Sequence, residues 1–154
     1  AFLKEAWMYT PLKTLIEEKG SQIHTVGPKA SALQAVRAMN EAQIGALLVT
    51  DRGKLTGIFT ERDVLARVVA EGRDPASVTV AEVMTTNIAV VAPSLTVKEA
   101  MAVVTEKRCR HLPVMKGEEL VGVISAGDLT RWVAKDQAET IEDLFRYITG
   151  QYPG

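Results

Sequence analysis

A gapless internal repeat is the feature of this sequence that most limits its fold. The segment 28–65 matches the segment 93–130 at a constant offset of 65 residues, without insertion or deletion. The identical pairs include Pro28 with Pro93, Gly57 with Gly122, and Asp63 with Asp128. One small structural unit therefore occurs twice, and the fold must accommodate both copies.

Each copy is predicted to contain a strand, a helix, two strands and a second helix, in that order. Capping-box patterns, in which Ser or Thr precedes Gln or Glu by three residues, start the first helices at Ser31 and Thr96. Two short apolar runs follow each helix, separated by a charged turn that contains glycine, which indicates a hairpin. The first strands are predicted at 23–26 and 88–91, and the second helices are predicted to begin at Thr60 and Ser125.

The composition between the copies marks a linker, which begins at Gly72 and contains Pro75. The predicted divisions are a lead-in helix in 1–20, a first domain in 21–74, a segment 75–137 with the linker, a second lead-in helix and the second domain, and an amphipathic helix in 138–154. Each core would comprise roughly 60 residues, which is small for independent stability. We therefore expect the two copies to pack against each other as a pseudo-two-fold pair, with a ligand cleft between them.

The last helix is expected to begin at Thr140 and to carry an apolar stripe. The stripe consists of Ile141, Leu144, Phe145 and Ile148. A stripe of this kind needs a partner surface, and symmetric association of two copies would bury it. We therefore expect a homodimer.

Charge and cysteine content exclude several functional classes. Eighteen Lys and Arg residues against nineteen Asp and Glu residues give a net charge of −1, so no overall field attracts nucleic acid. A single cysteine, Cys109, excludes an internal disulfide, and with two histidines it leaves too few ligands for a structural zinc site. No stretch approaches the roughly 18 apolar residues of a membrane span. We expect a cytoplasmic protein that binds neither membranes nor nucleic acid.

Two segments share a pattern of glycine, two apolar residues, Thr or Ser, two variable residues and Asp. They are Gly57-Ile58-Phe59-Thr60-Glu61-Arg62-Asp63 and Gly122-Val123-Ile124-Ser125-Ala126-Gly127-Asp128. With the segments 44–49, 80–85 and 110–114, this pattern resembles the CBS-domain (cystathionine-β-synthase-type) family over about residues 11–135. The combination of motifs is specific, whereas each one alone is weak.

The resemblance implies an α/β (α+β) fold of two tandem CBS domains, each a β-α-β-β-α sandwich. It also implies a homodimeric sensor without a catalytic cofactor, which binds AMP, ATP, NAD(H) or an S-adenosyl compound such as S-adenosylmethionine between its domains and regulates a target protein. In the family, the motif Asp holds the ribose hydroxyls and the motif Thr or Ser lies near the phosphate. Carried over, one site uses Ile58, Thr60, Arg62 and Asp63 with Arg110 and His111, and the other uses Val123, Ser125 and Asp128 with Gly45 and Ala46.

The motif residues also have a purely structural interpretation. A hydroxyl at Thr60 or Ser125 can cap a helix, and an acid three residues later complements the positive end of the helix dipole. The same geometry offers free N–H groups to a phosphate and a carboxylate to vicinal hydroxyls, so the two roles are compatible. Because the basic residues fall in one predicted site, we expect the Asp63 site to bind phosphates more tightly than the Asp128 site.

Two other functional classes compete with nucleotide sensing. An enzyme would need an activated nucleophile, a metal cluster or paired carboxylates in a pocket, and the sequence contains neither G-x-S-x-G nor a Walker-type loop. We therefore expect no catalytic activity. A dimerisation scaffold without a ligand is the second alternative, and a binding assay separates it from a sensor.

Overall fold

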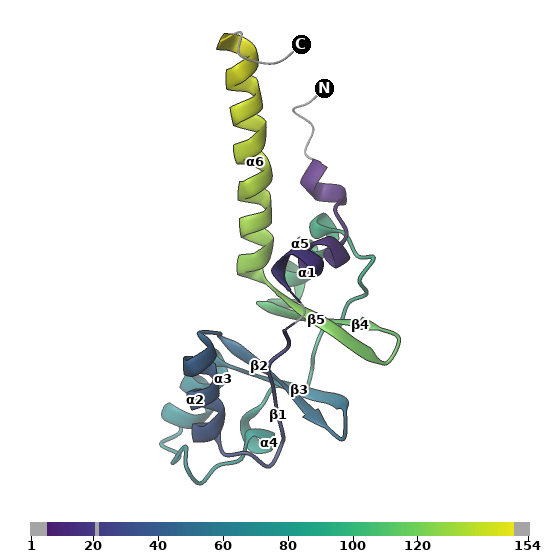
Figure 1. Ribbon diagram of the computed structural model, residues 1–154. Coiled ribbons are helices and arrows are strands. Elements are labelled where there is room, and N and C mark those ends of the chain that lie inside the picture. The colour runs from purple at the N-terminus through teal and green to yellow at the C-terminus, as the bar shows by residue number, and fades with distance from the viewer. Residues whose placement is uncertain (1–5, 21, 150–154) are drawn as a thin grey trace.

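Two β-sheets divide the molecule into two halves, each covered by helices (Figure 1). The structure is a computed structural model that describes residues 6–20 and 22–149, with side chains described up to residue 138. Helices and strands alternate in both halves, so the predicted fold class, two tandem α+β domains forming a pair, is confirmed.

The first half contains a three-stranded sheet in the order β1-β2-β3. Its elements are β1 (Thr25–Val26), α2 (Ala32–Ala42), β2 (Ala46–Asp51), β3 (Lys54–Thr60), α3 (Glu61–Asp63), the π-helix η2 (Val64–Val69) and, after the linker, α4 (Val80–Val83). β1 pairs with β2 in parallel, and β2 and β3 form an antiparallel hairpin. The capping box between Ser31 and Gln34 opens α2, as predicted.

The second half contains a two-stranded antiparallel sheet. Its elements are α5 (Val97–Lys107), β4 (His111–Lys116), β5 (Glu119–Ser125) and α6 (Ala126–Thr149). The described part of the chain begins with the 3-10 helix η1 (Ala6–Tyr9), which α1 (Leu12–Lys19) follows. Thr96 and Glu99 form the predicted capping box of α5. The hairpins of the halves obey the repeat, because Ala46 pairs with Thr60 as His111 pairs with Ser125.

The predicted first strand of the second half, 88–91, is wrong. Only Val91 pairs there, through an isolated parallel bridge to Val114. In the first half, the Leu48 N–H donates to the His24 carbonyl at 3.2 Å. The repeat places Pro113 at the position of Leu48, and proline has no N–H to donate. The second half therefore lacks the hydrogen bond that extends β1.

The lead-in helices exchange partners between the halves. Leu12 and Leu15 of α1 are buried in the core of the second half, whereas Val80 and Val83 of α4 are buried in the core of the first. Backbone hydrogen bonds fix both contacts, from Leu12 N–H to Leu95 O and from Val80 N–H to Ala30 O, each 2.8 Å long. The exchange ties each half to a segment that precedes the other.

The predicted separate helix at the C-terminus is also wrong. A single 24-residue helix, α6, runs from Ala126 to Thr149 and projects beyond the sheet of the second half (Figure 1). Thr140 can act as an N-cap, but no proline or glycine follows Gly127 within α6, so the helix continues through Thr140. The predicted apolar stripe at Ile141, Leu144, Phe145 and Ile148 lies outside the described side chains.

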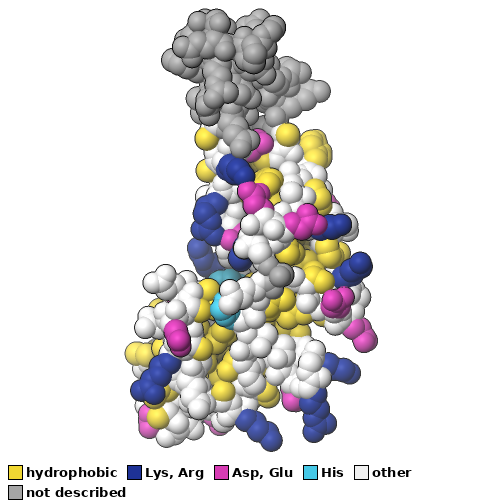
Figure 2. Space-filling view, viewed as in Figure 1, with side chains coloured by type: hydrophobic (Ala, Val, Ile, Leu, Met, Phe, Trp, Pro, Cys, Tyr) yellow, Lys and Arg dark blue, Asp and Glu magenta, His cyan; other side chains and the backbone are white. Residues whose placement is uncertain are grey.

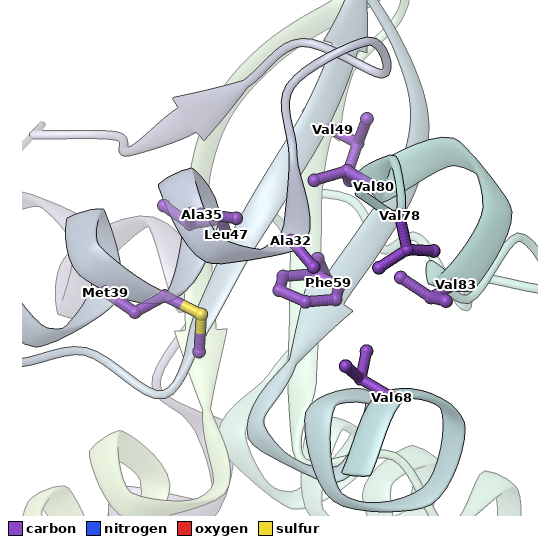
Figure 3. Close-up of a cluster of buried hydrophobic side chains, with 10 residues drawn as sticks. All are labelled: Ala32, Ala35, Met39, Leu47, Val49, Phe59, Val68, Val78, Val80 and Val83. Carbon is purple, nitrogen blue, oxygen red and sulfur yellow. The ribbon is translucent and has the colours of Figure 1, made fainter. Parts of the chain in front are cut away.

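The core of the first half forms between one face of the sheet and the helices α2, α4 and η2. Figure 3 shows Phe59 at its centre, facing α2 and α4. Its buried members are Ala32, Ala35, Met39, Leu47, Val49, Phe59, Val68, Val78, Val80 and Val83. Leu47, Val49 and Phe59 alternate along paired strands, which directs them to one face. This packing fixes the position of β2, whose first residues lie close to the second half.

Candidate functional site

A cavity of about 320 Å³ lies between the two halves. It is lined by Lys19, Gly20, Gln22, His24, Ile44, Gly45, Ala46, Leu48, His111, Val123, Ser125, Asp128 and Arg131. Figure 2 shows histidine side chains (cyan) where the upper and lower halves meet. The start of β2 forms one wall, and the start of β4, the end of β5 and the start of α6 form the other.

The polar end of the cavity is built at the junction of β5 and α6. The Ser125 N–H donates to Asp128 Oδ2 at 2.8 Å, and the Asp128 N–H donates to Ser125 Oγ at 3.0 Å. This reciprocal pair is a capping box, which opens α6 and fixes the carboxylate at its positive end. Ser125 and Asp128 therefore do cap a helix, as their structural interpretation predicts.

Two cations contact the same carboxylate. Lys19, the last residue of α1, places its Nζ 2.7 Å from Asp128 Oδ2 and 3.1 Å from the Val123 carbonyl. Arg131, one turn along α6, places Nη2 2.6 Å from Asp128 Oδ1. A Cβ atom on Gly127 would lie 3.2 Å from Arg131 Nη1, so the glycine leaves room for the guanidinium.

These contacts perturb the acid–base properties of the site. Burial raises the pKa of Asp128, but the hydrogen bonds from Lys19 and Ser125 outweigh it and hold the pKa below its usual 3.8. Burial, followed by the nearby charges of Arg110 and Lys19, lowers the pKa of His111 below its usual 6.5. Asp128 is therefore a carboxylate near neutral pH, and His111 is a neutral imidazole.

The structure brings together one of the two predicted residue sets. All five members of the Asp128 set line the cavity, namely Gly45, Ala46, Val123, Ser125 and Asp128. The cavity is also lined by His111, which the resemblance assigned to the other set. Gly45 leaves room for the neighbouring Glu61 carboxylate, because a Cβ atom at position 45 would lie 3.3 Å from Glu61 Oε1.

The Asp63 set is engaged within its own half. Asp63 is 5 % exposed and accepts hydrogen bonds from the Thr60 N–H and Thr60 hydroxyl at Oδ2 and from the Thr85 hydroxyl at Oδ1. Ile58 is buried, and its backbone pairs with Thr85. The remaining predicted members, Arg62 and Arg110, are exposed and do not line the cavity.

The sequence predicts that fixed positive charge is concentrated at the Asp63 site and missing at the Asp128 site. This is wrong for the Asp128 site, because Lys19 and Arg131 both contact Asp128. The contact between Arg131 and Asp128 could have been predicted from the sequence, because residues three positions apart on a helix are neighbours. Lys19 was not predictable in this way, because its contact depends on the side of the molecule against which α1 packs.

Three features of the described residues concern metal ligands, membrane-spanning helices and the thiol of Cys109. Residues 6–20 and 22–138 contain no group of three or more His, Cys, Asp or Glu side chains placed to hold a metal ion. No described helix is both long and apolar enough to cross a lipid bilayer. Cys109 is half-buried, and burial raises the pKa of its thiol, which does not favour a reactive thiolate.

Comparison with known proteins gives consistent matches over both halves. The family model of the CBS domain matches residues 20–70 and 80–135. A mitochondrial CBS domain-containing protein of Arabidopsis thaliana is 37 % identical over 77 % of the chain, which spans 60 % of that relative's length. A CBS domain-containing protein of Bacillus subtilis is 33 % identical over 71 % of the chain and 77 % of its own length. A solved structure with CBS domains from Burkholderia ambifaria is 40 % identical, with a TM-score of 0.80 over 83 % of this chain and 96 % of that one.

Proposed function

Because this chain belongs to the CBS-domain family, we propose that it is a non-catalytic regulatory module whose cavity between the two halves binds an adenine nucleotide. The cavity beside Asp128 is the observation that carries the proposal. Its volume of about 320 Å³ falls within the range of small-molecule sites. The signal would pass to a partner protein through a change in how the halves pack.

The lining of the cavity suits the parts of a nucleotide. Ile44, Leu48 and Val123 offer apolar surface to a purine ring. Asp128 offers a charged acceptor to ribose hydroxyls, and charge-assisted hydrogen bonds of this kind are strong. The start of α6 and the adjacent cations offer positive potential to a phosphate.

The Asp128 site is the better candidate of the two motif sites. The Asp63 carboxylate is buried and has donors from its own half on both oxygens. A ligand at Asp63 would have to replace these internal hydrogen bonds, and among the described residues Arg67, 3.7 Å away, is the one cation paired with that carboxylate. We therefore propose the Asp128 site as the principal binding site, in place of the preference for Asp63 that the sequence favoured.

Calorimetric titration of the nucleotide-stripped full chain tests the proposal. AMP, ATP, NADH and S-adenosylmethionine are titrated in turn into the wild type and into Asp128→Asn, with Asp63→Asn as the matched control. Binding that is at least tenfold weaker in Asp128→Asn, and close to wild type in Asp63→Asn, supports the assignment. Heat from none of the four ligands contradicts it and favours the scaffold alternative, whereas consumption of a nucleotide by the wild type contradicts the non-catalytic role.

The second part of the proposal is that the protein forms a homodimer. We also propose that it acts in the cytoplasm. Leu65 and Val69 of η2 are 65 % and 64 % exposed, and they lie four residues apart. Two large apolar side chains on one surface are favourably buried against a symmetric copy. Light scattering at micromolar concentration tests this, because a mass near 16.7 kDa contradicts a dimer, whereas a doubled mass that Leu65→Glu returns to 16.7 kDa supports it.

A further inference from the structure

The carboxylate of Asp128 is held by cations rather than by neutral donors alone. Lys19 Nζ lies 2.7 Å from Oδ2, and Arg131 Nη2 lies 2.6 Å from Oδ1, so each oxygen has a cationic partner. The Asp128 side chain is 12 % exposed, while that of Lys19 is 41 % exposed. The carboxylate is thus mostly buried, whereas Lys19 is more exposed and also lines the cavity.

The equivalent carboxylate in the first half is held differently. Asp63 Oδ1 accepts from the neutral Thr85 hydroxyl at 2.9 Å, and its nearest cation, Arg67, lies 3.7 Å away. The repeat places Ala66 at the position of Arg131. The close cationic pair is therefore specific to one half, although the helix cap itself is shared by both.

A ligand that binds the Asp128 carboxylate displaces its cationic partners, Lys19 and Arg131. Such a ligand must therefore offer these cations another negative charge. A ribose hydroxyl can replace the hydrogen bonds that Asp128 accepts, but it offers no negative charge to Lys19. Separating a partly buried ion pair without a replacement charge is unfavourable. A phosphate on the same ligand supplies that charge, whereas an uncharged nucleoside does not.

We propose that Lys19 and Arg131 determine the charge specificity of this site, so that it selects phosphorylated adenine nucleotides over uncharged or positively charged adenine compounds. This inference rests on the proposed function and narrows its ligand class. In the bound state the ammonium of Lys19 moves from Asp128 to a phosphate oxygen, and ribose hydroxyls take its place on the carboxylate. Specificity then arises as much from the penalty imposed on neutral ligands as from attraction of the anion.

Titration with AMP and with adenosine measures this selectivity directly, because the two ligands differ only in the phosphate. The full-length wild type is expected to bind AMP at least tenfold more tightly than adenosine. Lys19→Met keeps an apolar stem without the charge, and it should reduce this preference about tenfold. Arg131→Met should reduce it less, because the Arg131 side chain is 73 % exposed and more strongly screened by solvent.

Two further variants serve as controls. Lys19→Arg retains the charge and should retain the preference for AMP. Lys13→Met removes a lysine from the same helix at an exposed position outside the cavity, and it should bind both ligands as the wild type does. The inference is overturned if the wild type binds AMP and adenosine with equal affinity, or if both charge-removing variants keep the wild-type preference. Failure of the wild type to bind adenosine and any of AMP, ATP, NADH and S-adenosylmethionine would instead overturn the proposed function itself, and the inference with it.

Discussion

The hydroxyl of Thr85 donates a hydrogen bond to the buried carboxylate of Asp63, with 2.9 Å between Oγ1 and Oδ1. Thr85 follows the lead-in helix α4, and Asp63 is the last residue of α3, immediately before the π-helix η2. The bond therefore joins the linker side of the chain to the motif of the first half. It also occupies an oxygen of the Asp63 carboxylate, which the sequence analysis predicts to bind a ligand.

Replacing Thr85 with valine should destabilise the fold, because Asp63 Oδ1 would lose its hydroxyl donor while Asp63 remains 5 % exposed. An unsatisfied buried acceptor costs about 1–3 kcal/mol. Urea unfolding measures the loss in the free energy of unfolding. The control is Thr86→Val, at the exposed neighbouring position. Equal stability of the two variants would show that the Thr85 hydroxyl does not support the carboxylate.

The first glycine of each motif is explained by a close approach of a lead-in segment. A Cβ atom on Gly57 would lie 2.5 Å from Met84 Sδ and 3.0 Å from the Thr85 carbonyl, whereas one on Gly122 would lie 3.1 Å from the Ile16 side chain. Overpacking of this kind typically costs about 1–3 kcal/mol. Gly57→Ala should therefore be destabilising in thermal or urea unfolding, and more so than Gly122→Ala.

Gly27→Ala is the matched control for the glycine variants, because a Cβ atom there meets no other atom within 4 Å. Its stability should remain close to that of the wild type. A loss of stability as large in Gly27→Ala as in Gly57→Ala would show that the effect arises from the substitution type and not from the lead-in contact.

Much of the fold was predictable because its signals are local. The capping boxes at Ser31 and Thr96 begin the helices where the sequence places them. The hairpins follow from alternating apolar residues and turns, and the repeat transfers one assignment to the other copy. The continuity of α6 past Thr140 was missed because a residue that can cap a helix need not do so when no breaker precedes it.

The candidate site was predictable only in part. Asp128 and Ser125 came from the motif, but Lys19 is 109 residues distant from Asp128 in sequence. No local pattern predicts that α1 packs on the second half, because the apolar face of α1 could pack equally well against the core of either half. The two motif carboxylates also differ in their partners, because the Thr85 hydroxyl contacts Asp63 whereas the Lys19 ammonium contacts Asp128. This difference depends on long-range packing and has no local sequence signal.

Pro113 offers a direct test of why the second sheet has two strands. Pro113→Val restores an N–H at the position equivalent to Leu48, and we expect it to donate to the Ala89 carbonyl and to extend the Val91 bridge into a short strand. The stability change should be small, because the hydrogen bond contributes about 0.5–1.5 kcal/mol and the lost proline rigidity offsets about 0.4–1 kcal/mol. Hydrogen exchange is therefore the measurement. The amide at position 113 should be protected, and exchange as fast as in an unstructured peptide would contradict this explanation.

His111 should make stability depend on pH in the mildly acidic range. Its pKa in the folded protein lies below 6.5, so the unfolded chain binds the proton more readily than the folded chain does. The free energy of unfolding should therefore fall as the pH decreases from 7 to 5, by at most ~1.4 kcal/mol per pH unit for one proton. Asp128 acts in a separate range, because its pKa lies below 3.8 and its contribution is lost only in stronger acid.

The comparison of wild type with His111→Gln in urea unfolding at pH 7, 6 and 5 isolates this contribution. The variant should lose less stability over that range, because it has no imidazole to protonate on unfolding. An NMR titration of the His111 ring in the folded wild type should give a midpoint below 6.5. A midpoint above that value would mean that the anionic neighbours Asp128 and Glu61 outweigh burial and the cations Arg110 and Lys19, and identical pH slopes for the two proteins would mean that these effects cancel.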